Sequence, residues 1–196
     1  MLRTESIFRI LTALLFVTAL FISGYFRRKA EREGGVLRTP VGNKLIVVMR
    51  LMALVVVLPL FGYWINPGWV AWARFALPDW LRWTAAGVAV ALIPVMVWVF
   101  ASIGKNISAS HDTRQGHVLV THGPYRWVRH PLYSVGFLFA VALMVITALW
   151  WLAGMILPLF VLLVRTTKEE AKLIETFGDE YRDYMKRTGR FLPRWM

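Results

Sequence analysis

The stretch YSVGFLFAVALMVITALWWLAGMILPLFVLLV, residues 133–164, decides the fold, because it is apolar throughout and carries no charged residue. A helix needs about 20 apolar residues to cross the hydrocarbon core, so this stretch is too long for one upright span and short for two. Thr147, the pair Trp150 and Trp151, and Gly154 lie near its middle, and tryptophan prefers the membrane interface. The pattern predicts a tight helical hairpin of two short spans, with one long tilted helix as the alternative.

Three further apolar stretches precede the hairpin, and each is long enough to cross a bilayer. They are residues 7–26, 45–65 and 83–103, with Pro59 and Pro94 predicting kinks in the second and third. The first is not expected to be a signal peptide, because its apolar part is too long and no small-residue cleavage pattern follows it. The sequence therefore predicts an all-α integral membrane protein with about five transmembrane helices.

Basic residues indicate which side of the membrane each connection occupies, because cytoplasmic loops carry an excess of lysine and arginine. Residues 27–50 are strongly basic, whereas residues 66–82 hold two arginines and one aspartate. We therefore expect the first connection in the cytoplasm, and the loop of residues 66–82 and the N-terminus outside. The same alternation places residues 105–129 and the tail, residues 165–196, on the cytoplasmic side.

Composition agrees with a membrane protein and argues against other classes. Apolar residues make up 58% of the chain and charged residues only 17%, against about a quarter in soluble domains. The net charge of +12 is not taken as a sign of nucleic-acid binding, because the basic residues flank apolar spans and suit anionic lipid. The chain has no cysteine, so disulfides and thiolate metal sites are excluded.

All the histidines fall within one cytoplasmic connection, at His111, His117, His122 and His130. Such density of polar and turn residues between two spans favours a functional site, and an interfacial loop among lipid headgroups is the alternative. The spacings match no helical pair of metal ligands, so no metal is predicted.

A second polar cluster follows the hairpin, where Arg165 and Glu169 share one helix face at i, i+4. One interpretation is that the two residues form a surface ion pair. The other is that the Arg165 guanidinium binds an anionic ligand group and the Glu169 carboxylate binds a cationic one. Composition leaves both interpretations open.

Motifs in the C-terminal half carry a family resemblance. They are Gly123-Pro-Tyr125, Arg129-His130-Pro131-Leu132-Tyr133, Glu169-Glu170 and Phe177-Gly178-Asp179-Glu180-Tyr181-Arg182-Asp183-Tyr184. In order and spacing this set resembles the isoprenylcysteine carboxyl methyltransferase family and related membrane methyltransferases.

The resemblance implies an S-adenosyl-L-methionine-dependent methyltransferase whose site faces the cytoplasm. It implies a catalytic region in residues 105–196, and the apolar stretches predict a three-span region before it, in residues 1–104. The residues it assigns to the cofactor are His117, Val118, Leu119, Val120, Tyr125, His130, Pro131, Leu132, Tyr133 and Glu169. Arg165 falls on the substrate side, and Arg165 and Glu169 are the expected catalytic pair. Pro131 is expected to keep His130 out of helical geometry, because a residue before proline is disfavoured there.

Several neighbouring residues are expected to be structural. Arg129 is expected in structural pairing, and Glu170 on the helix surface, because it points about 100° away from Glu169. The segment Phe177–Tyr184 is expected to cover the site, with buried structural tyrosines. Tyr125 and Tyr133 have an alternative role as interfacial anchors.

The acceptor is expected to be lipophilic or lipid-modified, with a carboxylate favoured and a thiol or an amine left open. Membrane lipids are expected partners, and no obligate protein partner is expected. One rival interpretation is a sterol-reductase-like enzyme that binds NADPH, using Arg114, Arg126 and Arg129 for the 2′-phosphate. Another is a non-catalytic bundle that binds lipid or a partner helix.

Overall fold

The computed structural model describes residues 2–34, 43–104 and 118–194, and within these ranges it is helical, with isolated bridges and no β-strand. The α-helices are α1 (Leu2–Gly34), α2 (Asn43–Ile65), α3 (Asp79–Ile103), α4 (Pro131–Thr147), α5 (Ile156–Phe177) and α6 (Asp179–Arg187). Short 3₁₀ helices are η1 (Pro67–Ala73), η3 (Gly123–Arg126) and η4 (Trp150–Met155). The all-α prediction is confirmed.

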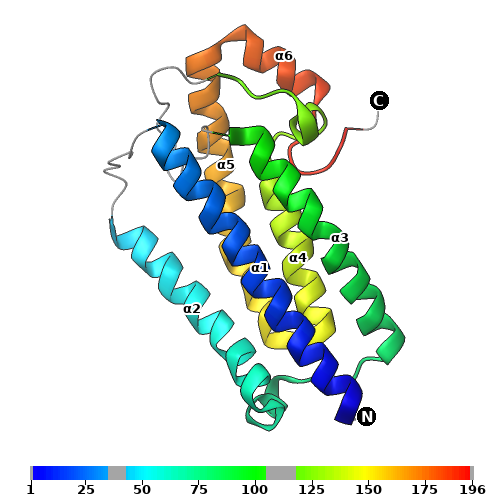
Figure 1. Cartoon of the computed structure of the whole chain (residues 1–196). Helices are drawn as coiled ribbons and strands as arrows, with labels where there is room; N and C mark the ends of the chain where they lie inside the picture. The colour runs from blue at the N-terminus through cyan, green and yellow to red at the C-terminus, as the bar shows by residue number, and fades with distance from the viewer. Residues whose placement is uncertain (1, 35–42, 105–117, 195–196) are drawn as a thin grey trace.

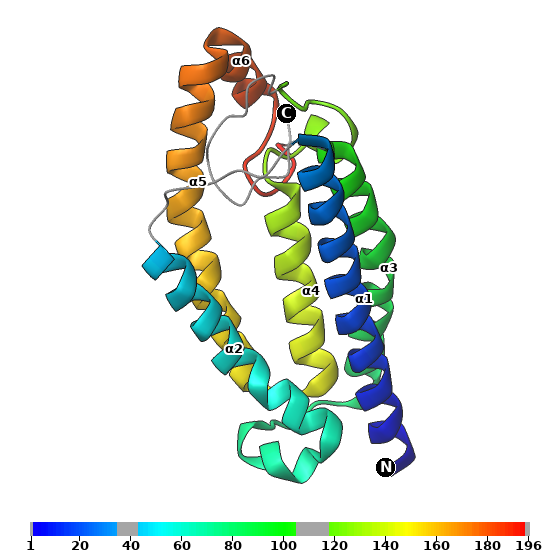
Figure 2. The ribbon, with the colours of Figure 1, turned by 60° about the vertical axis from the view of Figure 1, so that its left-hand side comes forward.

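The long helices form a bundle in which α4 lies along α3 and α1 packs against both (Figure 1). Helices α2 and α5 lie on the other side of α4, as Figure 2 shows. One hydrophobic core joins the two halves of the chain, with Phe8, Val99 and Ile146 among its fully buried members. The N-terminus lies at one end of the bundle, and α6 and the C-terminal tail lie at the other (Figure 1).

Two helices in the described part of the chain have the length and composition to cross a membrane. They span Thr4–Glu33 and Asp79–Ile103, and only 22% and 28% of their most apolar windows are buried. The core helix of a soluble protein would be mostly covered, whereas here Leu14 and Phe21 stand exposed on α1. Exposed apolar surface on this scale suits contact with lipid. The count of five spans stays a prediction.

The long apolar stretch, residues 133–164, forms a hairpin. Helix α4 ends at Thr147, and Ala148 adopts a left-handed conformation with φ of 53°. The Ala148 carbonyl accepts a hydrogen bond from the Phe75 amide at 3.0 Å, which ties the turn to the segment after η1. The chain then passes through η4 and returns along the bundle as α5 (Figure 1). The helical hairpin is confirmed, and the alternative of one long tilted helix is wrong.

A buried polar cluster joins helices at the end of the bundle that holds the N-terminus. Arg82, 5% exposed, donates hydrogen bonds to Glu5 Oε2 at 3.0 Å and to the Ile146 carbonyl at 2.7 Å. Tyr63 donates to Glu5 Oε1 at 2.7 Å, and Arg74 to Glu5 Oε2 at 3.0 Å. These bonds fix α1 against α2 and α3, far along the bundle from the tail.

Candidate active site

The Arg-His-Pro motif forms the start of α4, at the end of the bundle that carries α6. Pro131 occupies the first turn of the helix, where its missing N–H costs nothing. A residue before proline is disfavoured in helical geometry, and His130 has φ of −123° and ψ of 58°. The sequence prediction that His130 stands outside the helix is confirmed.

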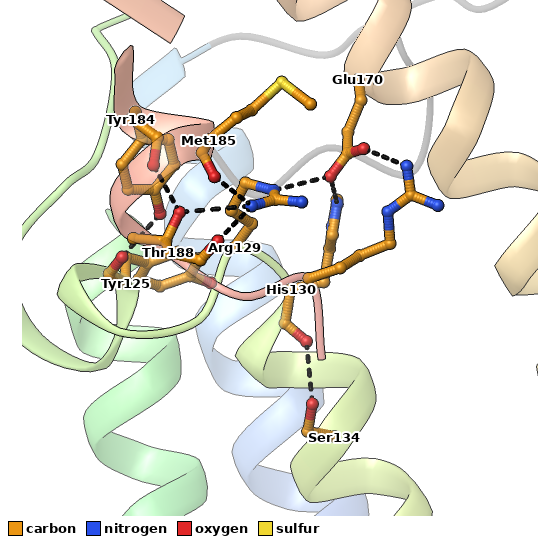
Figure 3. Close-up of polar contacts among 9 residues, drawn as sticks. Tyr125, Arg129, His130, Ser134, Glu170, Tyr184, Met185 and Thr188 are labelled. Carbon is orange, nitrogen blue, oxygen red and sulfur yellow. Dashed lines mark hydrogen bonds and ion pairs between the residues drawn. The ribbon is translucent and has the colours of Figure 1, made fainter. Parts of the chain in front are cut away.

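Glu170, on α5, is the buried centre of an ion cluster that we call the Glu170 cluster: Arg129, His130, Glu170 and Arg190, of which Arg190 is partly exposed. Figure 3 shows the Glu170 carboxylate pointing toward Arg129 and His130. Arg129 Nε donates to Glu170 Oε1 at 2.8 Å, and His130 Nε2 lies 3.3 Å from the same oxygen. Arg190 donates to the other carboxylate oxygen, Oε2. Because an ionised carboxylate only accepts hydrogen bonds, the proton in the His130 contact belongs on Nε2.

The surroundings of Glu170 keep it ionised. Burial by itself would raise the pKa of its carboxyl group, since a charge is disfavoured away from water. The hydrogen bonds from His130, Arg190 and Arg129 outweigh burial and lower the pKa to about 2. The carboxylate therefore stays charged across the physiological range.

The expectation that Glu170 lies on a helix surface is wrong, because Glu170 is only 2% exposed. A helical projection describes α5 alone, whereas the tail folds over this face and brings Arg190 to the carboxylate. The expected structural pairing of Arg129 is confirmed. Besides Glu170, its guanidinium donates to the carbonyl oxygens of Met185 and Thr188.

The C-terminal tail pairs along the Arg-His-Pro motif, which sequence reasoning missed. The amides of Arg129 and His130 donate to the carbonyls of Gly189 and Arg190 at 2.9 and 3.0 Å. In return, the Gly189 amide donates to the Trp127 carbonyl at 3.0 Å. These backbone hydrogen bonds hold the segment before α4 in place.

Tyr125 lies inside the protein rather than at a lipid interface, which excludes the anchor interpretation for it. The residue is 6% exposed, and its carbonyl accepts a hydrogen bond from the Tyr184 hydroxyl at 2.6 Å (Figure 3). Burial raises the pKa of Tyr125, and nearby Tyr184, Glu169 and Tyr133 add to the rise. The structure therefore brings Tyr125 close to two other residues of the expected site, Tyr133 and Glu169.

Tyr133 stacks on the His130 ring with centroids 5.6 Å apart and planes 16° from parallel. The His130 ring also contacts the Phe191 ring of the tail, with centroids 5.8 Å apart and planes 37° from parallel. The helix α6 that follows the paired glutamates buries both Tyr181 and Tyr184. The prediction that these two are structural aromatics is confirmed.

The other residues expected at the site differ in their exposure to solvent. Val118, Leu119 and Val120 belong to no helix or strand, with Val118 exposed and the other two half-buried. Pro131 is buried, Leu132 and Glu169 half-buried. His117 lies outside the described residues, as does the side chain of Arg165, whose backbone belongs to α5.

Two of the arginines considered for an NADPH phosphate are engaged elsewhere. Arg129 is held by Glu170, and the Arg126 guanidinium lies 3.8 Å from the centroid of the Trp127 ring. Arg114 lies outside the described residues. Within the described residues, the pairing of Arg129 with Glu170 is the contact that weighs against a reductase.

Comparison with known proteins agrees with the motifs. Residues 85–175 match the model of the Isoprenylcysteine carboxyl methyltransferase (ICMT) family. The protein-S-isoprenylcysteine O-methyltransferase of Rattus norvegicus is 30% identical over 131 residues, which cover 63% of this chain and 45% of the relative. The methanethiol S-methyltransferase of Pseudomonas deceptionensis is 38% identical over 69 residues, which cover 35% of this chain and 26% of that protein.

A relative with a different name is the nickel-cobalt-cadmium resistance protein NccN of Alcaligenes xylosoxydans xylosoxydans. It is 33% identical over 117 residues, which cover 58% of this chain and 55% of NccN. The chain thus spans about half the length of the rat enzyme and of NccN, and less of the methanethiol enzyme. The family match contains the Gly-Pro-Tyr, Arg-His-Pro and paired-glutamate motifs. The predicted resemblance to the isoprenylcysteine carboxyl methyltransferase family is confirmed, and it is carried by residues 85–175 of this chain.

Proposed function

We propose that this protein is an integral membrane methyltransferase that uses S-adenosyl-L-methionine and has its site on the cytoplasmic side. The observation that carries the proposal is the meeting of three separate motifs at one end of the bundle. Tyr125 comes from η3, His130 and Tyr133 from the start of α4, and Glu169 from α5. Residues of types that bind such a cofactor therefore converge from segments far apart in the sequence.

The chemistry of these residues fits the cofactor, which has an α-ammonium, a carboxylate, an adenine and a sulfonium. The Glu169 carboxylate suits a charge-assisted hydrogen bond from the ammonium. The stacked His130 and Tyr133 rings offer both an aromatic surface and polar atoms. The irregular backbone of residues 118–120 offers amide and carbonyl groups.

When bound, the cofactor supplies a methyl group on a positively charged sulfur, ready for in-line displacement. The protein then contributes mainly position and exclusion of water. His130 and Tyr133 would orient the adenine and amino-acid ends, and Glu169 would fix the ammonium. Arg165 would hold an anionic acceptor in line.

The favoured acceptor is a carboxylate on a lipophilic or lipid-modified molecule. The rat relative is named for O-methylation of isoprenylcysteine and the Pseudomonas relative for S-methylation of methanethiol. A carboxylate is already ionised near neutral pH and needs no general base. A thiol or an amine acceptor would have to lose a proton first, with Glu170 or a histidine as the possible base.

Calorimetric binding of S-adenosylhomocysteine to the detergent-purified protein tests the proposal. We expect saturable binding that Glu169→Gln weakens by about tenfold or more, because a charge-assisted bond to the ammonium is lost. Glu175→Gln is the matched control, since Glu175 is exposed on the same helix. NADPH serves as comparator. Folded protein that binds NADPH and not S-adenosylhomocysteine would replace methyl transfer with the reductase interpretation.

A further inference from the structure

The tail from Thr188 to Phe191 lies beyond the family match, which ends at residue 175, and outside the motifs read from the sequence. It nevertheless contacts the Arg-His-Pro motif through both backbone and side chains. Its carbonyls at Gly189 and Arg190 accept the amides of Arg129 and His130. The Ser134 hydroxyl donates to the Phe191 carbonyl, so the contact continues into the first turn of α4.

The tail also supplies a charge to the Glu170 cluster. Glu170 Oε1 is shared by Arg129 and His130, whereas Oε2 bonds to Arg190. A carboxylate held from both oxygens has little freedom to rotate. Glu170 in turn accepts a hydrogen bond from His130 Nε2. Arg190 therefore acts on the position of the His130 ring through one intermediate residue, Glu170.

The His130 ring is therefore constrained on three sides. Tyr133 stacks on it, Phe191 packs at a tilt, and Glu170 accepts from its Nε2. Two of these constraints depend on the tail, Phe191 directly and Glu170 through Arg190. A motif that is already held in place loses less conformational entropy when a ligand binds, which is the general benefit of preorganisation.

We propose that the C-terminal tail is a positioning element of the site, acting through Arg190 on Glu170 and through Glu170 on His130. This inference rests on the proposed function, because it assigns the tail to the same cofactor site. Arg190 is a positioning residue and touches no ligand itself. The tail thereby contributes to the site from a segment that lies outside the family match.

The test compares Arg190→Ala and Arg190→Lys with the wild type by calorimetry with S-adenosylhomocysteine. We expect Arg190→Ala to raise the dissociation constant about tenfold, and Arg190→Lys to restore most of the loss because it keeps the charge. Arg182→Ala is the matched control, since Arg182 pairs with Asp179 on the exposed face of α6. It should leave the dissociation constant unchanged.

A double-mutant cycle separates positioning from general stability. In a Glu170→Gln protein, adding Arg190→Ala should weaken binding little further, because Arg190 acts through Glu170. Fully additive losses would overturn the inference, as would an Arg190→Ala protein that binds like the wild type. If Arg190→Ala fails to fold, Arg190→Gln, which keeps the length of the side chain without its charge, decides by the same criteria. Wild-type protein that does not bind at all refutes the proposed function instead.

Discussion

Glu170 Oε1 lies 2.8 Å from Arg129 Nε, although the two residues stand 41 positions apart in the sequence. Both side chains are almost completely removed from solvent, at 3% and 9% exposure. A buried ion pair gains little over an apolar pair of the same shape, but removing one partner leaves an uncompensated charge. The pair therefore makes the position of the Arg-His-Pro motif depend on α5.

Replacing Glu170 with glutamine should destabilise the protein. Arg129 and Arg190 would both lose their carboxylate, and breaking a buried pair typically costs about 3–5 kcal/mol. The free energy of unfolding, measured by titration with a denaturing detergent, checks this. Asp183→Asn is the control, because Asp183 pairs with Lys186 on the exposed face of α6. An equal effect of the two substitutions would contradict the buried pairing.

Stability should fall in acid because of the same group. The pKa of Glu170 is about 2 in the folded protein, below its usual value of 4.5, so folding favours the ionised form. Its contribution is complete above the unfolded-state pKa of about 4.5, and it is lost as the pH falls toward the folded-state value of about 2. Melting temperatures of the wild type and Glu170→Gln should therefore converge across this window. A constant difference down to pH 2.5 would argue against a depressed pKa.

Local sequence signals predicted the parts of the structure that local forces determine. The uncharged length of residues 133–164, with Trp150 near its middle, predicted the hairpin that Ala148 closes. The proline after His130 predicted a residue outside helical geometry. Both features follow from neighbouring residues and from the thickness of a bilayer.

The rest depended on which segments meet in space, and no local pattern reports that. Glu170 was assigned to the surface because its angle on α5 was considered without the tail that covers it. Arg82 was assigned to an outer loop, whereas Glu5 from α1 and the Ile146 carbonyl from α4 make its burial possible. In both cases the missing information was a partner more than 15 residues away.

Gly189 should be intolerant of a side chain. A Cβ added there would overlap the carbonyl oxygen of Leu192, which is backbone and cannot rotate aside. We expect Gly189→Ala to displace the tail from the Arg-His-Pro motif and to lower the melting temperature, with weaker S-adenosylhomocysteine binding. Gly136→Ala, on α4, is the control, because an added Cβ meets nothing within 4 Å there and alanine favours helix. Tolerance of alanine at Gly189 would show that the tail can move without consequence.

The cluster at the far end of the bundle should affect stability without affecting the site. Glu5→Gln weakens the contacts of Arg82 and Arg74 with a carboxylate, and charged hydrogen bonds of this kind contribute about 1.5–3 kcal/mol. The site lies at the other end (Figure 1), so the dissociation constant of S-adenosylhomocysteine should stay within about twofold of the wild type. Glu33→Gln, which loosens only the exposed pair with Lys29, controls for the loss of one negative charge. Comparing Glu5→Gln with Glu170→Gln at equal loss of stability then shows whether weaker binding follows from the Glu170 cluster itself. If both variants lose affinity in proportion to stability, the cluster supports the fold and has no specific role in the site.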